Sequence, residues 1–308
     1  MINTTKRQIR GIFLLTLTAF IWGTAFVAQR RGMDYVGPVT FIAVRFLIAT
    51  VSLLPVIYVR SIFSRNAEGE RPPVFSLPLI KSGAWCGVVI FACGMFQQIG
   101  IMYTTVGKSG FITTLYIVIV PIFGLPLGLR MKWHSWCCVC IAIAGMYLLC
   151  VNESVSLNRG DVLTLFCAIF YAVHILLVNH YSPLVDGVKL SCAQFFVCGA
   201  LALAAAFIFE EPKPQAIFSA WAPLLYTGVL SSGVAFTLQI LGQRDVNPTA
   251  ASLVMSLEAV FAVLMGWLLL SETLTAREIS GCVLIFAANI AVQLMGAMDA
   301  SGKRINSG

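Results

Sequence analysis

Long apolar stretches separated by short polar connections run through almost the whole chain. An α-helix needs about 20 mainly apolar residues to cross the hydrocarbon core of a membrane. Ten stretches meet this requirement, and they are residues 11–29, 37–59, 82–103, 108–129, 133–151, 161–180, 190–209, 217–240, 248–270 and 278–298. The longest polar insert, from Arg60 to Pro78, is too short for a catalytic domain outside the membrane. The pattern therefore predicts an all-α integral membrane protein with ten transmembrane helices.

The composition supports a chain that lies in a lipid bilayer. Of the 308 residues, 59% are hydrophobic and 11% are charged, whereas soluble domains carry about 25% charged residues. This excludes an ordinary soluble protein. The ten cysteines all lie in apolar stretches and lack the paired Cys-x-x-Cys spacing of zinc sites, so we expect them to behave as small apolar residues. We therefore expect no metal and no cofactor.

Basic residues are concentrated in alternate connections. If the N-terminus is cytoplasmic, the connections on its side of the membrane hold Lys6, Arg7, Arg10, Arg60, Arg65, Arg71, Lys81, Arg130, Lys132, Lys189, Arg244, Lys303 and Arg304. The connections on the other side hold Arg30, Arg31, Lys108, Arg159, Lys213 and Arg277. Because cytoplasmic connections are rich in Lys and Arg, we expect a multi-pass protein with an uncleaved first span and both termini in the cytoplasm. The net charge of +7 follows from this topology and requires no nucleic-acid partner.

The two halves of the chain resemble each other. Residues Phe111–Phe123 align with Thr249–Phe261, and in both places a short polar connection precedes the segment and another apolar stretch follows it. Five spans per half is an odd number, so the second half must lie upside down relative to the first. We therefore expect a first repeat over residues 1–152, an inverted second repeat over 153–298 and a cytoplasmic tail over 299–308. Inverted repeats are the common architecture of secondary transporters.

Five short motifs follow one another along the chain in a characteristic order. They are Phe20-Ile-Trp-Gly-Thr-Ala-Phe26, Arg45-Phe46-Leu47, Pro121-Ile122-Phe123, Ser256-Leu-Glu-Ala-Val-Phe-Ala262 and Trp267-Leu-Leu-Leu-Ser-Glu-Thr-Leu-Thr275, the last leading into Gly281. Together they resemble the drug/metabolite transporter superfamily, in its ten-span branch of paired EamA-type repeats, from about residue 10 to residue 298. Ala259 departs from the pattern, since that family often has a proline there. Arg130-Met-Lys132 also departs from it, because the second half has Ser271-Glu272 at the corresponding place.

The resemblance implies a secondary transporter without enzymatic activity that exports a small organic metabolite across a bacterial cytoplasmic membrane. Amino acids and their derivatives are the first substrate class that it implies, and amphipathic drugs are the second. A nucleotide-sugar or other solute exchanger is the alternative within the superfamily, and an intramembrane enzyme or a channel is the alternative outside it. The expected partners are a small-molecule substrate, the lipid bilayer and a coupling proton, and the sequence leaves the oligomeric state open.

Direct use of ATP is excluded by the absence of a nucleotide-binding loop. The segment Gly107-Lys108-Ser109 is the one lookalike, and it has Met102 where the first glycine of a P-loop belongs. Transport would then be driven by an ion gradient, by exchange or by the gradient of the substrate.

Two charged residues lie deep inside predicted spans, Arg45 in the second and Glu258 in the ninth. A central arginine costs about 2.5–3.5 kcal/mol on insertion scales, so it should face the interior of the bundle and have a partner. We expect both residues to line a central cavity, where they form a switchable ion pair that binds a substrate or couples transport to a proton. The alternative is a fixed structural pair that holds the two repeats together.

His174 lies one turn beyond Tyr171 on one face of the sixth stretch. Histidine titrates near neutral pH and suits a proton relay. A lone buried histidine is more often a hydrogen-bonded core residue, and we expect that role here, with the relay as the alternative.

Further polar and aromatic side chains mark candidate walls of the cavity. Thr113 and Tyr116 share a face of the fourth stretch, Trp22 lies on a polar face of the first, and Gln98 adds an amide in the third. The rings of Trp22, Tyr116 and Tyr171 suit an aromatic or amphipathic substrate.

A bend is expected in the fourth stretch, at Pro121, Gly124 and Pro126. Proline removes a backbone hydrogen bond of the helix, and glycine loosens its packing. Bending at this hinge would open and close one side of the cavity, whereas a static kink would have the same sequence pattern.

Overall fold

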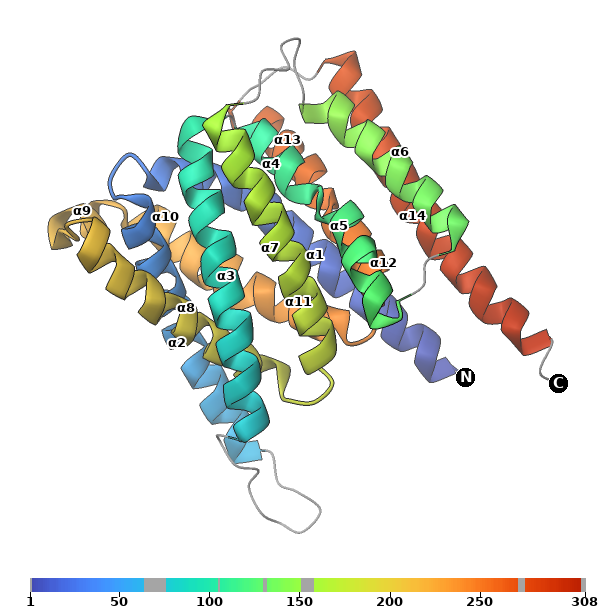
Figure 1. Ribbon diagram of the computed structural model, residues 1–308, viewed down its shortest axis with the longest axis horizontal. Helices are drawn as coiled ribbons and strands as arrows, with labels where there is room; N and C mark the ends of the chain where they lie inside the picture. Colours follow the sequence, from blue (N-terminus) through green and yellow to red (C-terminus); the bar gives the residue numbers. More distant parts are fainter. Residues whose placement is uncertain are drawn as a thin grey trace.

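The computed structural model describes residues 2–63, 76–104, 106–129, 132–150, 158–270 and 275–305, and in this part of the chain every regular element is a helix. The α-helices are α1 (Ile2–Gly32), α2 (Pro38–Phe63), α3 (Leu77–Tyr103), α4 (Val106–Thr114), α5 (Tyr116–Gly124), α6 (Trp133–Cys150), α7 (Arg159–Tyr181), α8 (Gly187–Phe209), α9 (Pro214–Ser219), α10 (Trp221–Leu225), α11 (Thr237–Gln243), α12 (Pro248–Met255), α13 (Leu257–Leu270) and α14 (Ala276–Ile305). The 3-10 turn η1 (Leu125–Leu127) follows α5, and the π-helix η2 (Tyr226–Phe236) joins α10 to α11. Figure 1 shows a single helical bundle, with the two chain ends near the same corner.

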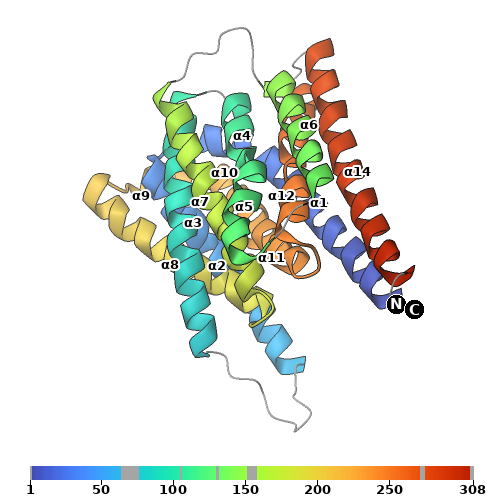
Figure 2. The ribbon, with the colours of Figure 1, turned by 45° about the vertical axis from the view of Figure 1, so that its right-hand side comes forward.

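In the part of the chain that the structure describes, eight helical segments are long and apolar enough to cross a membrane. They are Lys6–Gly32, Pro38–Ile62, Leu77–Tyr103, Ser109–Leu127, Arg159–Tyr181, Gly187–Phe209, Trp221–Gln243 and Pro248–Met265. Each corresponds to one of the predicted stretches. The two remaining predicted stretches lie in α6, which has a shorter apolar segment, and in α14, and these two helices pack side by side at one edge of the bundle (Figures 1 and 2).

Some predicted features lie outside the described residues. They are the boundary between the two halves at residues 152 and 153, most of the polar insert (residues 64–75), the Arg130 position and the Ser271-Glu272 pair. Helix α14 continues to Ile305, beyond residue 298, where the predicted tail begins.

The distribution of side chains is that of a protein surrounded by lipid. Polar side chains such as Thr18, Ser82 and Gln194 are fully buried between helices, while Phe207 and Phe209 are more than 70% exposed. In a membrane, polar side chains gain by hydrogen bonding to neighbouring helices, and apolar side chains lose nothing by facing acyl chains. The exposed apolar surface therefore fits a bilayer.

Two of the membrane-crossing segments are interrupted by a single residue. Leu115 separates α4 from α5 and Ser256 separates α12 from α13, with nearly the same tight backbone (φ −59°, ψ −10° and φ −61°, ψ −13°). At each interruption a hydroxyl group donates to a carbonyl of the preceding turn, Thr114 Oγ to Phe111 O (2.8 Å) and Ser256 Oγ to Leu253 O (2.7 Å). Such bonds compete with the helix ladder and bend helices.

The interruption at Leu115 lies before the predicted hinge. Pro121 lies inside α5, which ends at Gly124, and Pro126 belongs to η1. The helix is interrupted beside Thr114, whose hydroxyl bonds back to the carbonyls of Gly110 and Phe111, and Thr114 is not among the predicted hinge residues. Whether the segment bends during transport stays a prediction.

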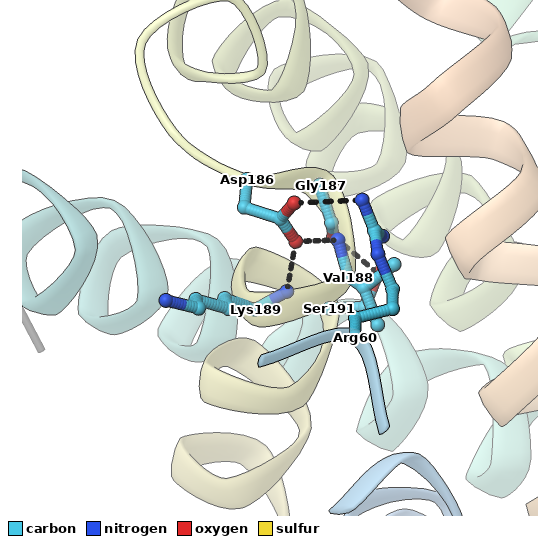
Figure 3. A network of polar contacts seen from close by, with 6 residues as sticks. All are labelled: Arg60, Asp186, Gly187, Val188, Lys189 and Ser191. Atoms are coloured by element: carbon cyan, nitrogen blue, oxygen red, sulfur yellow. Dashed lines mark hydrogen bonds and ion pairs between the residues drawn. The ribbon is translucent and has the colours of Figure 1, made fainter. Parts of the chain in front are cut away.

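Helices α2 and α8 run antiparallel and are tied together at both ends. At one end Asp186, the N-cap of α8, accepts hydrogen bonds from the backbone N–H groups of Val188 and Lys189 at 3.0 Å each. Its other carboxylate oxygen lies 3.1 Å from Nη2 of Arg60, in the last turn of α2 (Figure 3). One carboxylate therefore caps α8 and binds α2.

At the opposite end, α2 and α8 are connected by Glu210, the C-cap residue of α8. Its carboxylate accepts from the backbone N–H groups of Val39 (3.0 Å) and Thr40 (2.8 Å) and from the hydroxyl of Thr40 (2.6 Å). The first N–H groups of a helix have no partner within the helix, so the N-terminus of α2 is capped by a side chain from the other half of the chain.

We predict that Glu210→Ala destabilises the protein by about 1–3 kcal/mol, because the first turn of α2 loses its acceptor. Thermal unfolding of the detergent-purified protein measures the effect. The adjacent and exposed Glu211 is the matched control, and Glu211→Ala should unfold at the wild-type temperature. Equal unfolding temperatures for the two variants would contradict the prediction.

Candidate functional site

A small cavity lies inside the bundle, between helices that are far apart in the sequence. Its volume is about 30 Å³, enough for a single water molecule. The residues that line it are Trp22, Phe26, Gln29, Arg45, Gln97, Thr113, Tyr171, Ser231, Phe236 and Glu258. The walls thus come from α1, α2, α3 and α4 on the N-terminal side of the chain and from α7, η2 and α13 on the C-terminal side.

Arg45 is held by three neutral side chains. Its Nε donates to Ser232 Oγ (2.7 Å), its Nη2 to Ser231 Oγ (3.1 Å) and its Nη1 to Gln29 Oε1 (3.1 Å). The side chain is buried, and Arg45 has no ion pair among the described residues. Within this part of the chain, the guanidinium therefore has hydrogen-bond acceptors but no ion-pair partner.

The two serines reach Arg45 because η2 is a π-helix. A π-helix has wider turns than an α-helix, is rare, and occurs often at functional sites. Ser231 and Ser232 are adjacent in the sequence, and both hydroxyls accept from the same guanidinium. The carbonyl oxygen of Ser231 also accepts from Nε1 of Trp22 at 3.0 Å, which fixes the indole ring in the cavity wall. The sequence shows these two hydroxyls inside a span, but nothing in it assigns them to Arg45.

Glu258 lies in the first turn of α13, directly after the interruption at Ser256. Its Oε1 accepts a hydrogen bond from the hydroxyl of Tyr116 at 3.5 Å, and Tyr116 is the first residue of α5, directly after the other interruption. Glu258 is buried, with 4% of its surface exposed, and no Lys, Arg or His forms an ion pair with it among the described residues. The two interrupted helices therefore meet at this carboxyl group.

The predicted ion pair between Arg45 and Glu258 is not formed. Both residues line the same cavity, but each has its own neutral hydrogen-bond partners. Hydropathy places the two charges at similar depth, whereas their separation depends on how α2 and α13 are placed around the cavity. The guanidinium group of Arg45 and the carboxyl group of Glu258 thus line one cavity without neutralising each other.

Aromatic rings form much of the remaining wall. The ring centroid of Trp22 lies 4.8 Å from that of Phe236 and 5.7 Å from that of Tyr171, and Tyr116 lies 5.2 Å from Tyr171. The buried hydroxyl groups of Tyr171 and Thr113 have no hydrogen-bond partner among the described residues. Trp22, Thr113 and Tyr171 line the cavity, and Phe236 joins them from η2.

Three predicted site residues, Tyr116, Gln98 and His174, lie outside the cavity lining. Tyr116 is fully buried and packs against Tyr171. Gln98 donates from Nε2 to the backbone carbonyl of Gln29 at 3.3 Å, and its neighbour Gln97 faces the cavity in its place. His174 is fully buried outside the cavity lining, with Nε2 at 2.9 Å from Oε1 of Gln194. This geometry is that of the expected hydrogen-bonded core histidine. Among the described residues no three His, Cys, Asp or Glu side chains are grouped to hold a metal ion.

Sequence comparison relates the chain to transporters. Residues 9–151 and 158–293 match the profile of the EamA-like transporter family. An "Uncharacterized transporter" of Archaeoglobus fulgidus is 32% identical over 281 residues, which cover 91% of this chain and 84% of that protein. The "Uncharacterized inner membrane transporter YedA" of Escherichia coli is 26% identical over 290 residues, covering 91% of this chain and 90% of that protein.

Two further similarities concern a named exporter and a known fold. A "Probable terminal-alkyne amino-acid exporter" of Streptantibioticus cattleyicolor is 24% identical over 268 residues, covering 84% of this chain and 86% of that protein. A protein of known crystal structure superposes with a TM-score of 0.76 and 15% identity, covering 92% of this chain and 96% of its own. The low identity makes this a similarity of fold.

Close contact of α1 with α13 supports the wall that carries Glu258, and we predict that Gly23→Ala disrupts it. A Cβ atom at Gly23 would lie 2.7 Å from the carbonyl oxygen of Glu258 and 2.8 Å from the backbone nitrogen of Ala262, and backbone atoms cannot turn aside. Overpacking of this kind costs about 1–3 kcal/mol. Thermal unfolding should show the loss.

Gly110→Ala is the matched control for this substitution. A Cβ atom at Gly110 meets nothing within 4 Å, although the residue is buried in α4. Equal unfolding temperatures for Gly23→Ala and Gly110→Ala would show that α1 and α13 are not tightly packed at Gly23, which contradicts the prediction.

Proposed function

The chain belongs to the EamA-like transporter family, and from that premise we propose that it is a secondary transporter that exports small organic metabolites across the cytoplasmic membrane. Amino acids and their derivatives are the first substrate class, and amphipathic drugs are the second. The relative named as a probable amino-acid exporter supports the order of the two classes.

The observation that carries this proposal is the presence of Arg45 and Glu258 on one cavity without an ion pair between them. A buried charge is stable only when it is paired or well hydrogen-bonded. A zwitterion such as an amino acid would offer its carboxylate to Arg45 and its ammonium group to Glu258. The rings of Trp22 and Tyr171, which line the cavity, would contact an apolar side chain of the substrate, and Tyr116 packs behind Tyr171.

The size of the cavity supports a mechanism of alternating access. A volume of about 30 Å³ holds a water molecule, whereas pockets for small organic ligands measure about 300–1,000 Å³. The site in this conformation is therefore too small for a metabolite, and the bundle must widen to admit it. The predicted hinge at Pro121, Gly124 and Pro126, next to the interrupted α4–α5 segment, is our candidate for the moving wall.

We further propose ten membrane-spanning helices arranged as two inverted repeats, over residues 1–152 and 153–298. In this arrangement α6 and α14 are the last spans of the two repeats, and their mutual packing supports it. The interrupted segments α4–α5 and α12–α13 are then the fourth spans. Interrupted helices at corresponding positions of two halves point to the binding site of inverted-repeat transporters.

Close contacts between glycines support the same symmetry. A Cβ atom at Gly160 of α7 would lie 2.6 Å from the carbonyl oxygen of Gly100 at the end of α3. A Cβ atom at Gly11 of α1 would lie 2.9 Å from the carbonyl oxygen of Gly242 at the end of α11. The first span of each repeat thus meets the third span of the other repeat through a pair of glycines, and the two pairs lie at opposite ends of the bundle.

The surroundings of Arg45 have a counterpart in the second half. A glycine from the other half of the chain lies close to the backbone carbonyl in both places. A Cβ atom added at Gly228 would lie 3.0 Å from the carbonyl oxygen of Arg45, and a Cβ atom added at Gly87 would lie 2.8 Å from the carbonyl oxygen of Gln194. Arg45 also bonds to Gln29 on the preceding span, as Gln194 bonds to His174. Gln194 therefore takes the place of Arg45 in the proposed second repeat.

Polar contacts close both ends of the bundle beside the glycine pairs. Arg10 pairs with Asp245 at 2.6 Å, next to Gly11 and Gly242. At the opposite end the hydroxyl of Thr104 donates to Asp161 Oδ1 at 2.6 Å. We propose that these contacts open in turn, one when the cavity faces the cytoplasm and the other when it faces outward.

A proton is the proposed coupling ion, and Glu258 is its proposed carrier. The carboxyl group has the hydroxyl of Tyr116 as its partner and can bind either a proton or the ammonium group of a substrate. Competition between the two would link export of substrate to entry of protons. His174, which lies one turn from Tyr171, is the second candidate for proton transfer.

Both termini are proposed to be cytoplasmic, because the helix ends on their side of the bundle carry Arg10, Arg60, Lys81 and Lys189. We predict that green fluorescent protein fused after residue 308 fluoresces in cells, while alkaline phosphatase fused after Glu211 is active. Green fluorescent protein reports the cytoplasm and alkaline phosphatase the opposite side. An active phosphatase fused after residue 308 would contradict the topology.

Transport itself is tested first by comparing the metabolites released by cells with and without the protein. Uptake of the identified compound into inverted vesicles then gives a rate. We predict that Arg45→Lys and Glu258→Gln each lower this rate at least about tenfold, a loss of roughly 1.4 kcal/mol, because Lys lacks the planar fork of Arg and Gln lacks the charge of Glu.

Exposed residues of the same types provide the controls, and Arg31→Lys and Glu211→Gln should transport at the wild-type rate. Saturable uptake with counter-transport supports a carrier, and a non-saturable conductance would indicate a channel. Release of a nucleotide sugar in place of an amino acid would favour the alternative substrate class. Unchanged transport in both cavity variants would contradict the role of the two charges.

A further inference from the structure

Two cysteines that the transport mechanism does not use lie in direct contact at the centre of the bundle. The Sγ atoms of Cys93 on α3 and Cys167 on α7 are 3.4 Å apart, and the thiol of Cys93 also lies 3.7 Å from the backbone carbonyl of Cys167. Both side chains are buried. A disulfide requires about 2.0 Å between the sulfur atoms, so a relative movement of about 1.4 Å would bring them to bonding distance.

The pair lies directly behind the wall of the cavity. Gln97 follows Cys93 by four residues and Tyr171 follows Cys167 by four, so each lies on the same helix face one turn further along. Gln97 and Tyr171 both line the cavity. A small reagent that enters the cavity when the bundle opens is therefore about one helical turn, roughly 5 Å, from the thiols.

We propose that Cys93 and Cys167 form an oxidisable dithiol site, in which a membrane-permeant two-electron oxidant joins the two sulfurs in a disulfide that ties α3 to α7. With the diazene diamide as oxidant, one sulfur adds to the nitrogen–nitrogen double bond. The second sulfur then attacks the first and forms the S–S bond. The nitrogen pair leaves as a hydrazine that carries both thiol protons and the two electrons.

The consequence for transport rests on the proposed function. Helix α3 belongs to the first proposed repeat and α7 to the second, and the two helices pack along each other up to the Gly100–Gly160 contact. A covalent bond between them would prevent the two repeats from separating at this contact. Oxidation would therefore hold α3 against α7, and reduction would release the two helices.

The test uses the full-length protein in inverted vesicles treated with diamide. Peptide mapping by mass spectrometry without reduction should identify a Cys93–Cys167 disulfide, and the uptake rate should fall to that of vesicles without the protein. Dithiothreitol should remove the linked peptide and restore uptake. Mapping needs no variant and no transport, so it tests the dithiol site even if the proposed function is wrong.

Matched variants separate this pair from the other cysteines. Cys93→Ser and Cys167→Ser should keep their uptake rate in diamide, because neither can form the bond. Cys86 lies two helical turns before Cys93 on α3 and is also buried, but among the described residues it is not paired with another thiol. Cys86→Ser should therefore respond to diamide as the wild-type protein does.

Three results would overturn the proposal. Failure to find the linked peptide in oxidised wild-type protein would exclude the dithiol site. A linked peptide with unchanged uptake would show that α3 and α7 do not separate during transport, which contradicts the proposed effect of oxidation. Loss of uptake in diamide by the two serine variants would assign the inhibition to other cysteines.

Discussion

The guanidinium group of Arg45 is a charge in the middle of an apolar bundle, and the protein must supply it with acceptors from several helices at once. A charge at this depth costs about 2.5–3.5 kcal/mol unless it is satisfied. Gln29 on α1 and the serines Ser231 and Ser232 on η2 provide the acceptors. Gln29 is in turn contacted through its backbone by Gln98 of α3. Four helices are therefore placed relative to one another by the hydrogen-bonding requirements of one side chain.

The two sides of the cavity differ in how they are held. Arg45 lies on α2, which is tied to α8 at both ends through Asp186 and Glu210. Glu258 and Tyr116 lie on the interrupted helices, where hydroxyl groups compete with the helix ladder. One charge is thus fixed to a braced helix pair, and the other lies on helices that are interrupted by a single residue. In the proposed alternating-access cycle, this arrangement would keep Arg45 in place while Glu258 and its wall move.

Family and fold do not identify the substrate, so its chemistry has to be inferred from the side chains that line the cavity. The superposition with a TM-score of 0.76 at 15% identity shows that very different sequences form the same bundle. The reason is that apolar faces of similar length pack in a bilayer with little demand on residue identity, apart from small residues at close contacts. Two charged side chains that lie deep in the bundle, Arg45 and Glu258, face the same cavity. Substrate choice should therefore depend on few positions.

Hydropathy was sufficient to locate the helices, because a bilayer imposes the length and apolar character of each span on the sequence. It also identified Arg45 and Glu258 as buried charges, since no other charged residue lies deep in an apolar stretch.

The pattern on one helix fixes the face and depth of a side chain, but not the rotation of that helix against its neighbours. For that reason Gln97 and not Gln98 faces the cavity, His174 lies behind it, and the expected Arg45–Glu258 pair is absent. The contacts of Ser231 and Ser232 depend on a π-helix, and the interruption at Leu115 depends on how Thr114 bonds to its own backbone. These features arise from packing between different helices and from local hydrogen bonds that compete with the helix, and neither has a signature in the order of apolar and polar residues.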